Sequence, residues 1–136
     1  MPRHDDWIKK ATGDLKMAKK GIDDPDVADI AIYHTQQCAE KALKAYIIFH
    51  GTIPPKTHDL IILLDLCSLK DKNFKLLLTP VKNLNPLITV FRYPDDIIKN
   101  IDIKILTEAI IHATKVLDFI KEKIHELEIG QKNIFK

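Results

Sequence analysis

The sequence predicts an all-α protein, an up-and-down bundle of four to five helices. Apolar residues recur at helical spacing through most of the chain, and no stretch keeps the apolar/polar alternation of a strand for more than a few residues. The segment 26–50 contains no glycine or proline, is followed at once by Gly51, and carries two apolar stripes. We therefore expect it to form a central helix that is covered from two directions. We expect one helical domain over 1–128 and a frayed C-terminal tail over 129–136.

Composition restricts the class of protein. A chain of 136 residues that is 46% hydrophobic and 29% charged can bury one core and is too apolar to be disordered. The net charge of +2 does not indicate a general nucleic-acid binder. Cys38 and Cys67 lie in apolar helical contexts, which indicates buried, reduced thiols in a cytoplasmic protein. No apolar run is long enough for a signal peptide or a membrane span, so we expect no membrane association.

The first half of the chain carries recognisable helix boundaries. Asp5 and Asp6 can cap a first helix that ends near Gly21. Asp26 is a suitable cap for the central helix. Thr57 is placed to cap a third helix, which should be largely buried because apolar residues cover most of its circumference.

Prolines divide the second half. Pro80 suits the first turn of a fourth helix. Pro86 would cost about 3 kcal/mol inside a helix, so we expect a kink there or a restart with Asn85 as the cap. Asp102 then caps a last long helix. Its apolar stripe consists of Ile103, Leu106, Ile110, Ala113, Leu117, Ile120 and Ile124.

A polar strip runs between the two apolar stripes of the central helix. Its members are Tyr33, Gln37, Glu40, Lys41 and Lys44. The last four follow the spacing i, i+3, i+4 and i+7, which places them on one helix face. The strip is either a binding surface or a solvated face supported by a Glu40–Lys44 pair.

Arg92 is one of only two arginines in a chain with 19 lysines. Arginine in such a lysine-rich chain suggests a fork-shaped contact with a carboxylate or a phosphate. Together with Tyr93, at a helix end stopped by proline, it could hold a phosphate or stack on a base. The alternative is an internal ion pair of Arg92 with Asp95 or with Glu40.

Histidines supply the remaining candidates. His58 lies at the start of the third helix and could do acid–base work, although a histidine in such a place is more often a local hydrogen-bonding residue. His34 and Cys38 are four residues apart, but no second pair at ligand spacing accompanies them. We expect no metal site, and no motif indicates a cofactor.

Three segments together resemble the HEPN domain (higher eukaryotes and prokaryotes nucleotide-binding), especially its stand-alone prokaryotic branch. They are YHTQQCAEKALKAY at 33–46, KTHDLIILL at 56–64 and FRYPD at 91–95. The resemblance extends from Trp7 to about Glu126. It implies a bundle of about five helices that pairs as a homodimer. It also implies a partner, a minimal nucleotidyltransferase, with which such domains form two-gene modules, often of the toxin–antitoxin type.

Many members of the family that the chain resembles are metal-independent ribonucleases. Their sequence signature is an arginine, four to six residues, and then a histidine. Arg92 matches the arginine of the family's Arg-Tyr-Pro-Asp motif, but 19 residues separate it from the next histidine, His112. Arg3 is followed directly by His4. The resemblance therefore favours a noncatalytic module that binds nucleotide, RNA or a partner protein.

Three hypotheses follow. In the first, the chain is a dimeric binding module in which Lys41, Lys44 and Arg92 contact phosphates. Gln37 or Tyr93 contacts a base or ribose, and Glu40 and Asp95 orient the cationic side chains. Its binding residues would be Tyr33, Gln37, Glu40, Lys41, Lys44, His58, Arg92, Tyr93 and Asp95. In the second, the chain is a ribonuclease toxin in which His58 acts as acid–base and Arg92 binds the transition-state phosphate. In the third, the polar groups are internal salt bridges of a structural scaffold.

Overall fold

The computed structural model describes residues 3–86 and 103–134. The predicted site residues Arg92, Tyr93 and Asp95 lie outside these ranges, as does the predicted cap Asp102. The all-α prediction is confirmed, because the described ranges contain helices and no strand. The α-helices are α1 (His4–Lys20), α2 (Ala28–Phe49), α3 (Leu60–Lys70), α4 (Leu78–Leu84) and α7 (Ile103–Ile134). The 3-10 turns are η1 (Gly21–Asp23), η2 (Pro25–Val27) and η3 (Lys72–Leu77).

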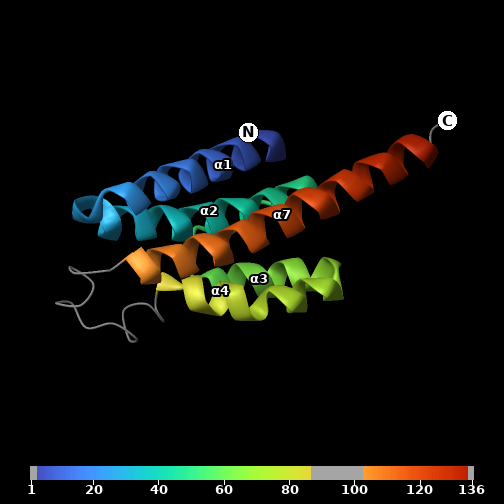
Figure 1. Ribbon diagram of the computed structural model, residues 1–136. Coiled ribbons are helices and arrows are strands. Elements are labelled where there is room, and N and C mark those ends of the chain that lie inside the picture. The colour runs from blue at the N-terminus through green and yellow to red at the C-terminus, as the bar shows by residue number, and fades with distance from the viewer. Residues whose placement is uncertain (1–2, 87–102, 135–136) are drawn as a thin grey trace.

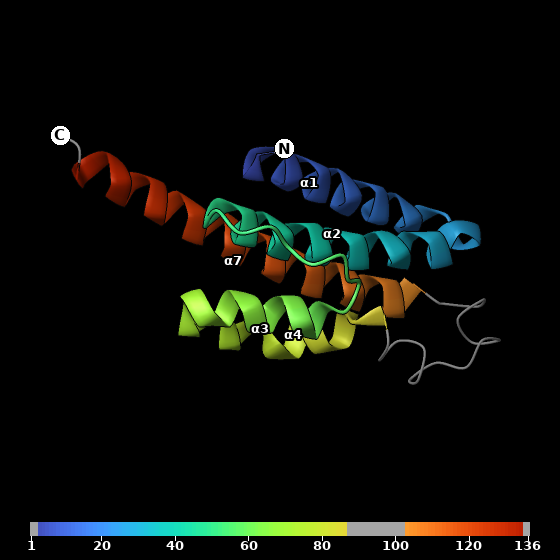
Figure 2. The same ribbon diagram turned by 180° about the vertical axis from the view of Figure 1, so that it is seen from behind.

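Helix α2 is the central element of the bundle. It packs against α1, α3 and α7, and Figures 1 and 2 show α1 on one side of the α2–α7 pair and α3 with α4 on the other. Most of its side chains between Ala28 and Ile47 are buried, as the two apolar stripes predict. None of the described helices is long and apolar enough to cross a membrane.

The core combines small residues, which let helices approach, with one aromatic cluster. Ala11 and Ala18 of α1 are fully buried against the central helix. The ring of Phe74 contacts Tyr46 in a tilted arrangement and Phe119 edge-on, with centroid separations of 4.3 and 5.1 Å. These rings join α2, η3 and α7 into one core.

Two predicted helix caps are wrong. Helix α2 begins only at Ala28, after the turn η2, and the carboxylate that caps this turn is Asp24, which accepts from the backbone N–H of Asp26 at 3.2 Å. Helix α3 is capped by Asp59, whereas the predicted cap, Thr57, accepts from the N–H of Asp59 at 3.1 Å. Both misses have the same cause, because a local turn with its own cap precedes each helix.

Asn85 ties the end of α4 to the start of α3. Helix α4 ends at Leu84, and Asn85 is extended, which confirms the predicted interruption before Pro86. The Asn85 side chain, only 3% exposed, accepts from the N–H of Leu60 and donates to the carboxylate of Asp59, both at 3.1 Å. The chain therefore leaves α4 directly beside the first turn of α3.

The last helix is longer than predicted. Its apolar stripe from Leu106 to Ile124 is buried, as expected. The tail that was predicted to fray from residue 129 is helical through Ile134. Helix α7 extends past the neighbouring helices at its C-terminal end (Figure 1).

Candidate functional site

One polar group inside the bundle is centred on Glu40 of α2. Glu40 is 5% exposed, and its two carboxylate oxygens have different partners. Oε1 lies 2.8 Å from Nδ1 of His58, and Oε2 accepts from Nζ of Lys44 at 3.0 Å. We call Glu40, Lys44 and His58 the Glu40 group. A buried carboxylate that is satisfied on both oxygens holds its partners in place.

A reversal of the chain brings His58 to this group. Gly51, directly after α2, has φ +79°, a left-handed conformation that favours glycine. The chain then runs back along α2 to the start of α3 (Figure 2). His58 thus reaches Glu40, 18 residues earlier in the sequence.

The contact with Glu40 fixes one nitrogen of the His58 ring. Its side chain is 80% exposed, so a buried carboxylate holds a histidine that is otherwise at the surface. A carboxylate on Nδ1 selects the ring tautomer and leaves Nε2 for an external group. The Glu40 group could therefore hydrogen-bond a phosphate or move a proton at Nε2.

Lys44 is buried rather than solvated. Its side chain is 10% exposed, and Nζ lies 6.0 Å from the ring centroid of Trp7 in α1. The predicted Glu40–Lys44 pair is confirmed, but the interpretation of this part of the strip as a solvated face is wrong. Burial under α1 explains the difference, which the spacing within α2 could not reveal.

Lys41 belongs to a second, separate group. Its Nζ donates to Oδ2 of Asp14 at 2.7 Å, and Oδ1 of the same carboxylate lies 2.9 Å from Nδ1 of His34. Asp14 is 8% exposed, and sequence reasoning did not single it out. The available signal was a carboxylate on the apolar face of α1, between Ala11 and Ala18.

The structure therefore divides the predicted strip. It brings together Glu40, Lys44 and His58, and it places Lys41 with α1. Tyr33 is 54% exposed and makes an edge contact with the neighbouring His34, at 5.9 Å between ring centroids. Gln37 is half-buried.

Both cysteines are free and buried, as predicted. Burial raises the pKa of each thiol, Cys38 and Cys67, to about 12. Because the thiolate is the reactive form, neither residue is suited to nucleophilic chemistry at neutral pH.

Comparison with known proteins gives one consistent result. The sequence profile of the HEPN domain matches residues 4–124. The crystal structure of ST0689, an archaeal HEPN homologue, matches with a TM-score of 0.71 and 26% identity, over 91% of this chain and 99% of that chain. A stretch of 47 residues is 45% identical to "Putative toxin MJ1304" of Methanocaldococcus jannaschii, and covers 35% of this chain but only 30% of that protein. The chain, with its bundle built around α2, belongs to the HEPN domain family.

Proposed function

We propose that this HEPN protein is the toxin-type component of a two-protein module, and that it binds a nucleotide or RNA phosphate at the surface around His58 without cleaving it. The observation that carries the proposal is the Glu40 group, in which a buried carboxylate orients an exposed histidine. A similar stretch in a protein named as a toxin supports the toxin-type role. The partner would be a minimal nucleotidyltransferase.

The position of Asn85 supports a role for Arg92 at the same surface. Asn85 is bonded to Asp59 and Leu60, next to His58, so the chain that leads to Arg92 departs from this point. Arg92 lies seven positions after Asn85 in the sequence, and seven residues of chain reach at most about 25 Å. Within the proposal, His58 and Arg92 serve one phosphate, the first through Nε2 and the second through its guanidinium.

The ion pairs that Lys41 and Lys44 form in the structure change which residues are expected to contact phosphate. Lys44 and Lys41 are each held within 3.0 Å of a carboxylate that is at most 8% exposed. Their charges are thus largely neutralised inside the protein. Within the proposal, these two lysines support the site, and the contacts to phosphate fall to His58 and Arg92.

A ribonuclease activity is the second candidate, and the same geometry favours it. Nε2 of neutral His58 would accept the proton of a ribose 2′-hydroxyl as its oxygen bonds to phosphorus, and Glu40 would stabilise the resulting imidazolium through Nδ1. The imidazolium would then return the proton to the 5′-oxygen as the phosphorus–oxygen bond to it breaks. Arg92 would stabilise the charge on the phosphate. The absence of the family's arginine–histidine spacing places this candidate second.

Pairing as a homodimer is part of the proposal. Large apolar side chains are exposed on the consecutive elements α3 and η3, including Leu69 at 81% and Leu76 at 75%. Exposed apolar surface of this kind is typical of an interface. Sedimentation of the wild type and of a Leu69→Glu, Leu76→Glu variant would test it. A wild type that sediments as a monomer at every concentration would contradict pairing.

The test of phosphate binding is a titration of fluorescently labelled RNA and nucleotides in EDTA, with the RNA products analysed in parallel. His58→Gln and Arg92→Ala should each weaken binding. Loss of one charge-assisted hydrogen bond costs about 1.5–3 kcal/mol, or roughly 10- to 150-fold in affinity. Matched controls are His125→Gln and Arg3→Ala, which change an exposed histidine and the other arginine.

The outcomes separate the three hypotheses. Binding that falls in both site variants, with intact RNA, supports the binding module. Cleavage by the wild type that both variants lose would replace it with the ribonuclease. Wild-type protein that binds no nucleotide or RNA, and does not co-purify with a co-expressed nucleotidyltransferase, would leave only the scaffold.

A further inference from the structure

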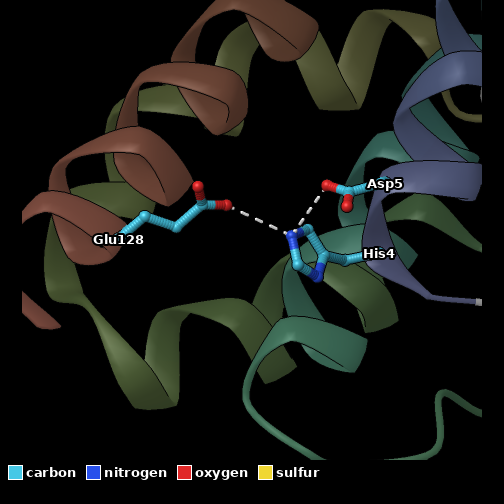
Figure 3. Close-up of side chains that lie close together, drawn as sticks. All are labelled: His4, Asp5 and Glu128. Carbon is cyan, nitrogen blue, oxygen red and sulfur yellow. Dashed lines mark hydrogen bonds and ion pairs between the residues drawn. The ribbon is translucent and has the colours of Figure 1, made fainter. Parts of the chain in front are cut away.

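Three side chains with metal-binding atoms meet where the first turn of α1 lies beside α7 (Figure 3). Nε2 of His4 lies 3.0 Å from Oδ1 of Asp5 and 3.3 Å from Oε1 of Glu128. All three atoms lie within 4.8 Å of one another. This cluster is separate from the Glu40 group and goes beyond the proposed function. His4 and Glu128 are 124 residues apart in the sequence, so no spacing motif could predict the cluster.

The distances fit the ligand shell of one metal ion. Ligand atoms that lie about 2.0–2.2 Å from a Zn²⁺ ion are roughly 3.0–3.5 Å from one another. The two distances from His4 fall in this range. The ligand oxygens of Asp5 and Glu128 lie within 4.8 Å of each other, and rotation of these partly exposed side chains would bring them to the required separation. We propose that His4, Asp5 and Glu128 bind one divalent transition-metal ion of the zinc class through an imidazole nitrogen and two carboxylate oxygens.

The charges at the cluster favour a divalent ion. Two carboxylates converge on one imidazole, which can neutralise at most one negative charge. The second oxygen of Asp5 lies 3.3 Å from the Arg3 guanidinium, but both groups are more than 60% exposed, so solvent weakens that pair. A divalent ion at Nε2 would neutralise both carboxylates at once. The single imidazole ligand favours a transition metal over Mg²⁺ or Ca²⁺.

Packing orients the imidazole before any ion arrives. The His4 side chain is 16% exposed, and its ring meets the ring of Phe49 edge-on, with centroids 4.9 Å apart and an interplanar angle of 88°. A ligand that is already held in place loses little conformational entropy on binding. The two carboxylates are more exposed, at 63% for Asp5 and 43% for Glu128, so an ion can enter from solvent.

An open hollow adjoins the three ligands. It has a volume of about 480 Å³, and its other polar lining residues are Lys121, Glu122 and His125. Three protein ligands leave at least one coordination position of a zinc-class ion unfilled. The hollow has room for water in that position. The ion would therefore link α1 to α7 and keep an exchangeable ligand.

The test uses the untagged full chain after dialysis against EDTA and then metal-free buffer. Zn²⁺ binding is measured by calorimetry, and Co²⁺ binding by its visible absorption. Trp7, the single tryptophan of the chain, lies three residues from His4, so its fluorescence should report binding independently. We expect one ion per chain, and a melting temperature that rises with Zn²⁺ concentration.

Variants assign the ligands. His4→Gln and Glu128→Gln should each lower the affinity roughly 100-fold or more, because a neutral amide is a much weaker ligand than an imidazole or a carboxylate. His125→Gln is the matched control, since this histidine lines the hollow but is not among the three ligands. Asp5→Asn is a second variant at an exposed position, should His4→Gln fail to fold. Absence of Zn²⁺ binding by the wild type, or binding that the ligand variants leave unchanged, would overturn the proposal.

Discussion

Replacement of Glu40 by alanine is expected to destabilise the protein strongly. Glu40 is 5% exposed, and the Lys44 ammonium that it neutralises belongs to a side chain that is only 10% exposed. The variant therefore leaves a buried positive charge without its carboxylate. Breaking a buried ion pair in this way costs about 3–5 kcal/mol.

This loss of unfolding free energy can be converted into a change in melting temperature, because the unfolding entropy scales with the length of the chain. An unfolding entropy of about 2.1 cal/mol/K per residue gives roughly 0.29 kcal/mol/K for this chain. The expected loss therefore lowers the Tm by about 10–17 °C. Urea and thermal unfolding of Glu40→Ala, followed by far-ultraviolet circular dichroism, would measure both quantities.

Two further variants identify the cause. Glu40→Ala with Lys44→Met should recover most of the loss, because the double variant removes the uncompensated charge and keeps an apolar side chain. His58→Ala should cost clearly less than Glu40→Ala, since its side chain is 80% exposed and water can replace the ring on Oε1 of Glu40. If Glu40→Ala cost less than about 1 kcal/mol, or if the double variant were no more stable than the single one, the buried-pair reasoning would be refuted.

Three other predictions concern packing, thiol reactivity and pH. Gly21→Ala would place its Cβ 2.5 Å from a side-chain carbon of α2 and should cost about 1–3 kcal/mol of stability in urea unfolding. Gly13→Ala meets nothing within 4 Å and should stabilise α1 by about 0.5–1 kcal/mol. Equal effects of the two substitutions would contradict the packing argument. Cys38 and Cys67, whose pKa values burial raises to about 12, should react with a thiol reagent at neutral pH only after denaturation, and rapid labelling of the native protein would be the contrary result. Burial lowers the pKa of His50, so the unfolded state takes up a proton first as the pH falls through about 6.5, and stability should decline there. A His50→Gln variant should show a shallower decline in urea unfolding across that pH range, and an unchanged slope would exclude this contribution.

The helices could be predicted because their signals are local. Periodic apolar residues, the glycine-free segment 26–50, and the interruption before Pro86 all act within a few residues of the position that they affect. The exact caps were harder to predict. Asp24 caps the turn η2 and Asp59 caps α3, and each lies two residues from the capping residue that the sequence predicted, Asp26 or Thr57.

The candidate site was predicted only in part. Spacing along α2 correctly paired Glu40 with Lys44, since both lie on one helix. It also grouped Lys41 with them, because a helical projection does not show what covers each side of the helix. Asp14 comes from α1 and His58 from the returning loop, and these two side chains divide the strip into separate groups.

By itself, the sequence determined that the chain is an all-helical bundle, that α2 is its central helix, and that its segments resemble the HEPN domain. Tertiary structure alone decided which charges meet. The partners of His58, Lys41 and His4 lie 18, 27 and 124 residues away in the chain, at Glu40, Asp14 and Glu128. Such distances along the chain carry no periodic signal. The packing of α1, α2 and α7 sets the pairs, and a buried charge is stable only where that packing supplies its partner.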